Sequence, residues 1–89
     1  MKVNYYSIKD NVSGHFGPLV TSENDVAVLR DLRYVISDKT TKFNKFPEDF
    51  DLWHMGDLDD ESGIFTSDPY FITSLMGIKP FEEVSKDEV

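Results

Sequence analysis

Segments typical of strands lie on both sides of one helical pattern in this chain. The segment "VNYYSIK", Val3 to Lys9, is β-branched and aromatic without a breaker, which predicts a strand, and "DNVSG" after it predicts a hairpin turn. The next segment, "HFGPLV", would be the second strand, but it contains Gly17 and Pro18, and proline lacks the amide that a strand ladder needs. We therefore expect either an edge strand or a strand that is irregular near its middle.

The segment "TSENDVAVLRDLRYVISDK", residues 21–39, has the period of a helix. Its apolar side chains fall within an arc of about 120°, the width of a core-facing stripe. They are Val28, Leu29, Leu32, Val35 and Ile36. Arg30 lies on the far side of this helix and Arg33 on its flank, and Ser22 is the expected N-cap. Residues 39–47 then form a polar connection.

Apolar side chains recur with a period of two from Phe50 to Leu58. Phe50, Leu52 and Leu58 share one parity and Trp53 and Met55 the other, so this predicted strand has two apolar faces. One face should pack under the helix, and the other must meet solvent, a partner or a ligand. We expect Trp53 and Met55 to be buried in a homodimer interface.

The segment "LDDESG" predicts a turn, with Gly63 free to take a positive φ, and "IFTS" predicts a fourth strand. The following "DPYFITSLMGIKPF" is apolar and is either a fifth strand or one helical turn. The order predicts an α+β fold, a small antiparallel β-β-α-β-β sheet with one helix packed on one face. We expect a single domain over residues 1–80 and a charged, flexible tail over residues 81–89.

The chain has 89 residues, enough for one core that buries only about 60–65% of the surface of the unfolded chain. Self-association would therefore stabilise it. The absence of Cys excludes disulfides and thiolate metal ligands and suits a reducing cytosol. The segment "MKVNYYSIKD" has no apolar signal core, and no run approaches the roughly 18 apolar residues of a membrane span, so we expect a cytoplasmic protein without membrane contact.

Charge is segregated along the chain. The formal net charge of −8 argues against a protein that wraps duplex DNA. Yet Arg30 to Lys45 contains five basic and two acidic residues, a net +3, whereas Glu48 to Asp68 contains eight acidic residues and no Lys or Arg. Two solvated faces would explain this pattern. If the chain has a nucleic-acid surface, the first of these segments supplies it.

Aromatic residues make up 13% of the chain. Single-stranded nucleic acid binds by stacking bases on exposed rings beside a basic groove. Most rings must lie in the core of a domain this small, which leaves Tyr34, Phe43 and Trp53 as candidate platforms. The predicted nucleic-acid-binding set is Arg30, Arg33, Tyr34, Lys39, Lys42, Phe43 and Lys45.

The acidic stretch from Phe46 to Gly63 invites a metal or catalytic interpretation. A calcium loop needs Gly at its sixth position, but counting from Asp57 places Gly63 at the seventh, with a strand expected next. His15 and His54 lack the spacing of a zinc site. The sequence also lacks a serine elbow, a glycine-rich phosphate cradle and a Cys nucleophile. We expect no metal, no cofactor and no enzymatic activity.

Three segments together carry a family resemblance: "YYSIKD", the helix with "RDL" after an Asn-Asp start, and "KFPEDFDLWHMGDLDDESGIF". They resemble the small nonstructural protein of gokushoviruses, tailless single-stranded DNA phages of the Microviridae. The match covers most of residues 5–65 and is most specific from Pro47 to Gly63. Leu58 departs from it, standing where many members have Phe, and the residues after Asp68 match poorly.

This resemblance implies a protein of the infected bacterium's cytoplasm that is absent from the virion. It further implies a role in viral single-stranded DNA synthesis and packaging, with single-stranded DNA as the partner. The alternative is an acidic protein-interaction module that presents Glu48 to Glu61 to a basic surface of a host or phage replication protein, imitating the charge of DNA.

Overall fold

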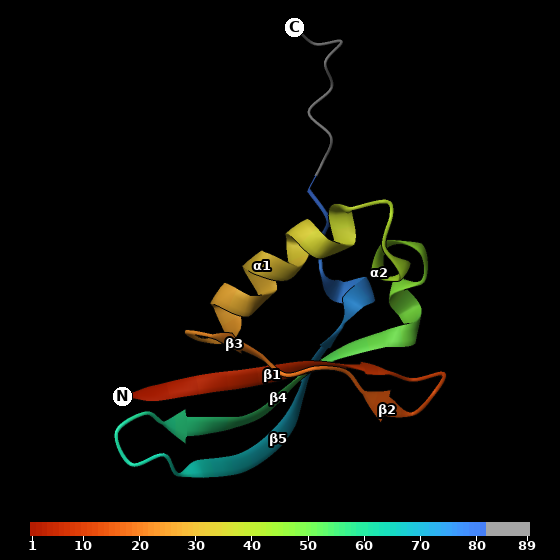
Figure 1. The fold of residues 1–89 in the computed structure, drawn as a ribbon. Helices are drawn as coiled ribbons and strands as arrows, with labels where there is room; N and C mark the ends of the chain where they lie inside the picture. The colour runs from red at the N-terminus through yellow and green to blue at the C-terminus, as the bar shows by residue number, and fades with distance from the viewer. Residues whose placement is uncertain (82–89) are drawn as a thin grey trace, which may run out of the picture.

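The computed structural model describes residues 1–81, which form one five-stranded antiparallel sheet with a helical layer on one face (Figure 1). The elements are β1 (Lys2–Asp10), β2 (His15–Phe16), β3 (Val20–Ser22), α1 (Asp25–Ser37), α2 (Lys42–Lys45), β4 (Phe50–Asp59) and β5 (Phe65–Ser74), with 3₁₀ turns at Pro47–Asp49 and Leu75–Gly77. The predicted α+β class, with one main helix on a small antiparallel sheet, is confirmed.

The edge beside β1 is interrupted, as the sequence predicts. β2 pairs with the end of β1 and β3 with its first half, and Gly17 and Pro18 lie in the gap between them. The other edge of β1 pairs with β4, which pairs with β5. The fifth strand of the sheet therefore arises from this split. The segment predicted as a fifth strand or a helical turn instead extends β5 to Ser74 and then forms the 3₁₀ turn.

The N-cap of α1 is Asn24, so the prediction of Ser22 is wrong. The Asn24 side-chain oxygen accepts a hydrogen bond from the Ala27 amide at 2.8 Å. Ser22 is the last residue of β3 and pairs with Asn4 of β1. Because sheet pairing holds Ser22 in extended geometry, the chain turns only after it, and the next residue able to cap is Asn24.

The predicted polar connection over residues 39–47 contains helix α2. The Thr41 side chain caps α2 by accepting from the Asn44 amide at 3.2 Å, and Asn44 donates to the Ile36 carbonyl at 2.7 Å. These bonds tie the short helix to the end of α1. None of the helices within residues 1–81 is long and apolar enough to cross a membrane.

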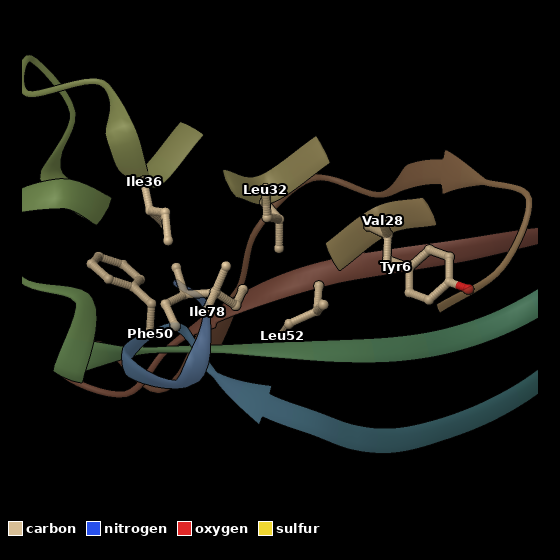
Figure 2. Packing of buried hydrophobic residues seen from close by; sticks show 8 residues of the cluster. Tyr6, Val28, Leu32, Ile36, Phe50, Leu52 and Ile78 are labelled. Atoms are coloured by element: carbon tan, nitrogen blue, oxygen red, sulfur yellow. The ribbon is translucent and has the colours of Figure 1, made fainter. Parts of the chain in front are cut away.

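The core lies between α1 and the sheet. Figure 2 shows side chains of α1 directed toward rings and aliphatic groups from the strands and from the C-terminal 3₁₀ turn. The buried cluster is Tyr6, Val28, Leu32, Ile36, Phe50, Leu52, Leu75 and Ile78, with Leu29 and Val35 packed at its margin. The predicted helical stripe is therefore confirmed. Burial of each large apolar side chain contributes about 1.5–3 kcal/mol.

A β-bulge interrupts the pairing of β1 with β4. Tyr5 lies opposite Gly56 while Tyr6 lies opposite His54, so Met55 is one extra residue in β4. Since side chains alternate between the two faces of a sheet, one inserted residue exchanges the faces of everything that follows it.

Because of the bulge, the face of the sheet predicted for Leu58 is wrong. Its partner on β1 is Val3, which has the parity of Tyr5 and not that of the core residue Tyr6. Leu58 therefore lies on the face away from α1, not beside Phe50 and Leu52 as its spacing predicts. The sequence alone could not reveal this exchange, because the bulge depends on pairing with another strand.

The predicted hairpin between β4 and β5 is present. Its turn is closed by the Gly63 amide, which donates to the Asp59 carbonyl at 2.8 Å, and Gly63 has the expected positive φ of 77°. The Asp59 carboxylate accepts from the amides of Glu61 and Ser62 at 3.0 and 3.4 Å. Residues 82–89, most of the predicted tail, lie outside the described residues.

Candidate nucleic-acid interface

The predicted nucleic-acid-binding residues all lie in the helical layer or its connections. Arg30, Arg33 and Tyr34 belong to α1, Lys42, Phe43 and Lys45 belong to α2, and Lys39 is an exposed residue between the two helices. In Figure 1 this layer covers one face of the sheet, and the acidic turn between β4 and β5 lies at the end of the sheet far from α2. The basic segment thus lies in the helical layer, away from the acidic turn.

The outer surface of α1 presents an exposed ring beside a cation. Tyr34 lies one helical turn after Arg30, so the two side chains share one face, and 65% of Tyr34 is exposed. Arg30 approaches Asp31 only at 3.9 Å, an exposed contact that contributes little. The Tyr34 ring packs against that of Phe81, with centroids 4.6 Å apart. Tyr34 is therefore available for stacking.

Arg33 has a role that its position in the sequence does not reveal. Its Nε donates to the Lys79 carbonyl at 3.0 Å, and its guanidinium lies 4.3 Å from the centre of the Phe81 ring. The Phe81 amide also donates to the Ser37 hydroxyl at 2.8 Å. Arg33 therefore fastens the end of the described chain to α1, and Phe81, expected in a flexible tail, contributes a second ring to this surface.

Phe43 is not an exposed platform, which corrects its predicted role. It is partly buried and meets Phe50 edge to face, with centroids 4.8 Å apart. The ammonium of Lys42 lies 5.7 Å from the Phe43 ring centre and 5.5 Å from that of Phe50. The cation–π contacts hold Lys42 above these rings while leaving its charge open to an anion.

Trp53 lies on the sheet face opposite the helical layer. Phe16 and Phe71 flank it nearly perpendicularly, at centroid distances of 5.6 and 6.0 Å. The Lys9 ammonium lies 5.4 Å from the Phe16 ring centre and 5.9 Å from the Trp53 ring centre. The Trp53 indole nitrogen is buried and has no hydrogen-bond partner within residues 1–81. Trp53 and Met55 are partly exposed and alternate with buried residues of β4.

A second aromatic group continues this open face. Tyr5 meets Phe65 edge to face at 5.6 Å, and the Phe65 ring lies over Gly56. We name the whole set the open-face stripe; it consists of Val3, Tyr5, Phe16, Trp53, Leu58, Phe65 and Phe71. Phe71 remains 52% exposed. Such a surface is larger and more aromatic than isolated exposed apolar residues, and contiguous patches of this kind are typical of interaction sites.

His54 is a buried structural residue on the helix side of the sheet. Only 3% of it is exposed. Its Nδ1 lies 2.9 Å from the Asp68 carbonyl and its Nε2 lies 3.1 Å from the Asn4 side-chain oxygen. Both ring nitrogens are thus engaged, which leaves none to bind zinc.

Two tyrosines anchor the start of α1 above His54. The hydroxyls of Tyr6 and Tyr70 donate to the Asp25 carboxylate at 2.7 and 2.9 Å, and the Tyr70 ring stacks on His54 at 4.5 Å. Burial, and then the Asp25 carboxylate, raise the pKa of both tyrosines. Sequence reasoning missed this cluster, because its members come from three strands and a helix.

The acidic turn is partly neutralised by the chain itself. The amino group of Met1 lies 3.1 Å from Asp60 and 3.4 Å from Glu61, and Lys2 lies 3.8 Å from Asp57. Hydrogen bonds from the amides of Glu61 and Ser62 lower the pKa of Asp59. Within residues 1–81, no three His, Cys, Asp or Glu side chains are grouped so that they could hold a metal ion.

Comparison with known proteins agrees with the resemblance found in the sequence. A family model described as "Phage ORF5 protein" matches residues 3–78. "Protein ORF5" of Chlamydia phage 1, a gokushovirus of the Microviridae, is 35% identical over 69 residues, which cover 73% of this chain and 72% of that protein. No solved structure matches the chain. The chain therefore belongs to the Phage ORF5 protein family and is a phage nonstructural protein.

Proposed function

We propose that this protein is a nonenzymatic factor of viral single-stranded DNA synthesis and packaging that binds single-stranded DNA through its helical layer. The observation that carries the proposal is the exposed Tyr34 ring, which lies one turn after Arg30 and against Phe81. Exposed rings beside cations bind single strands without reading their sequence, because every base has a stacking face.

The distribution of charge supports this surface. Arg30 belongs to α1 and Lys42 and Lys45 belong to α2, and the turn between β4 and β5 lies at the end of the sheet far from α2 (Figure 1). The net charge of −8 limits nonspecific attraction to phosphate, so the rings must supply much of the affinity. Binding is therefore expected to be moderate and to depend on both bases and salt.

Fluorescence anisotropy with a labelled single-stranded oligonucleotide across a salt series tests the proposal. Replacing Arg30, Lys42 and Lys45 with Gln should lower the slope of log K against log salt by about 0.7 for each phosphate that is no longer neutralised. Tyr34→Ala should weaken binding about 5- to 150-fold while the slope stays the same, since it removes stacking and no charge.

Lys2→Gln is the matched control, because it removes a positive charge beside Asp57 at the opposite end of the sheet. It should leave binding to the oligonucleotide nearly unchanged. Absence of binding at about 50 mM salt, or an unaltered slope in the triple variant, would contradict the proposed interface.

A homodimer forms the second part of the proposal. The open-face stripe is apolar and aromatic, and a second copy of the chain would cover it with the same residues. This arrangement leaves the helical layers of both copies free for DNA. The dimer acts in the cytoplasm of the infected bacterium and is not part of the virion.

The alternative partner is a basic surface of a host or phage replication protein, which would bind the acidic turn. Asp60 and Glu61 are exposed and so remain reachable, but they already contact the Met1 amino group. A pull-down of replication proteins should weaken when Asp57, Asp59 and Asp60 become Asn. Capture that survives these substitutions would exclude this alternative.

A further inference from the structure

A cavity of about 450 Å³ opens between α1, α2 and the split edge of the sheet. Its floor reaches the core residues Val28, Leu32 and Leu52, and Phe43 and Phe50 form the side toward α2. Pockets for small ligands usually measure about 300–1,000 Å³ and are lined mostly by apolar groups. The cavity therefore has the size and lining of a binding site.

The interruption of the edge strand keeps the cavity open. Gly17 and Pro18 line it in the gap between β2 and β3, and Gly17 has no side chain to fill the space. The Gly17 amide still donates to the Ile8 carbonyl at 2.9 Å, so the segment is tied to β1. A cavity with a mostly apolar lining favours an occupant with apolar surface.

Few polar groups line the cavity, and they differ in whether they already have a hydrogen-bond or ionic partner. The Asp10 carboxylate accepts from the amides of Val12 and Ser13 in the β1–β2 turn. The Lys42 ammonium lies over Phe43 and Phe50 and has no carboxylate within 4 Å among residues 1–81. The His15 side chain makes no hydrogen bond to any residue within residues 1–81. Among the described residues, the cavity thus combines an apolar slot with the Asp10 carboxylate, a lysine without a carboxylate partner and an imidazole without a hydrogen bond.

We propose that this cavity receives one base of a bound single strand and that Lys42 contacts a phosphate beside it. The inference rests on the proposed DNA binding, because Lys42 belongs both to the predicted binding residues and to the lining of the cavity. A nucleotide matches the three features together: a flat ring with apolar faces, a polar edge that His15 can bond, and an anionic phosphate. An apolar side chain of a protein partner would leave Lys42 without a counter-charge.

Anisotropy measurements with two oligonucleotides of equal length, one of thymidines and one of abasic sites, separate base insertion from phosphate binding. The wild-type protein should bind the thymidine strand about 5- to 150-fold more tightly. Val20→Phe narrows the cavity from β3, where an aromatic residue is tolerated. It should reduce this preference strongly, whereas Tyr34→Ala, outside the cavity, should reduce it only in part.

A second measurement observes the cavity directly. Thymidine 5′-monophosphate should shift the methyl NMR signals of Val28 and Leu32, which line the cavity, while inorganic phosphate should leave them in place. Val35→Phe fills the cavity from α1 and should abolish these shifts, which keeps the test decisive if Val20→Phe fails to fold.

The outcomes distinguish the two proposals. Equal binding of both strands with unmoved methyl signals would overturn the base cavity and leave the DNA-binding surface intact. Methyl shifts with the nucleotide but no strand binding at low salt would overturn the surface alone. Methyl shifts with an apolar peptide but not with the nucleotide would also overturn the base cavity, since they assign it to a protein partner.

Discussion

Gly56 occupies a place in β4 where no side chain fits. A Cβ atom there would lie 2.6 Å from the Phe65 ring and would also meet the Thr66 carbonyl oxygen. The Phe65 ring fills the space above the glycine and reaches Tyr5 on the neighbouring strand. The position of Phe65 in the open-face stripe therefore depends on the absence of a Cβ atom at Gly56.

Gly56→Ala should destabilise the fold by about 1–3 kcal/mol, the usual cost of forcing extra volume into a packed site. The carbonyl of a paired strand cannot move aside easily. Gly77→Ala is the control, since its Cβ would meet mainly the Thr73 hydroxyl, the end of a side chain that can rotate. Urea unfolding midpoints measure both, and equal losses of stability would contradict this account.

Asp59 makes the β4–β5 turn sensitive to acid. Amide hydrogen bonds from Glu61 and Ser62 lower the pKa of its carboxyl below the ordinary value of 3.8. A depressed folded-state pKa means that the stabilisation is fully present above the unfolded-state pKa and is lost as the pH falls through the folded-state pKa.

Asp59→Asn should therefore reduce the loss of stability on acidification below about pH 4. The amide oxygen of Asn can still accept both bonds, so the turn itself should persist. Asp31→Asn, whose carboxylate contacts Arg30, is the control. Thermal unfolding from pH 7 to pH 2.5 measures the effect, and identical pH profiles for wild type and Asp59→Asn would count against it.

At the scale of elements, the start of α1 is set by the sheet as much as by the helix. Ser22 and Asn24 are both good N-cap residues, and the sequence offers no reason to exclude Ser22. Pairing of β3 with β1 excludes Ser22 as the N-cap, because Ser22 is extended and lies opposite Asn4. Tertiary pairing therefore chooses between two locally acceptable starts.

Asn24→Ala should lower the free energy of unfolding by about 0.5–2 kcal/mol, since the Ala27 amide loses its acceptor. Ser22→Ala should have a much smaller effect, because the Ser22 hydroxyl makes no hydrogen bond within residues 1–81. Chemical unfolding followed by circular dichroism compares the two. A larger loss of stability for Ser22→Ala would place the cap where the sequence pattern predicts it.

At the scale of the whole molecule, two different surfaces lie on opposite faces of the sheet. The helical layer carries the basic segment, and the uncovered face carries the open-face stripe (Figure 1). A domain of this size buries a limited share of its apolar surface alone, so covering the stripe would stabilise it. The proposed DNA binding and the proposed self-association would therefore use different residues.

Phe71→Asp should weaken the proposed dimer roughly tenfold or more, because it places a charge in the middle of the stripe. Sedimentation velocity over a concentration series measures the change. Val26→Asp is the matched control: Val26 is 76% exposed on α1, so the same charge is introduced on the other side of the molecule. A wild-type protein that stays monomeric at high micromolar concentration would exclude the dimer.

Local sequence determined much of this protein. The apolar stripe of α1, the break at Gly17 and Pro18 and the turn at Gly63 follow from periodicity and from the conformational limits of single residues. These features depend on neighbours within a few positions in the chain. The resemblance to a phage family also rested on such short patterns.

Only the tertiary structure decided the rest. The bulge at Met55 moves Leu58 to the other face, β3 pairing moves the helix cap to Asn24, and packing against Phe50 withdraws Phe43 from the surface. Arg33 meets Phe81 across the fold, and the cavity forms where α1, α2 and the broken edge fail to close. Each of these depends on contacts between residues distant in sequence, which periodicity within one segment cannot encode.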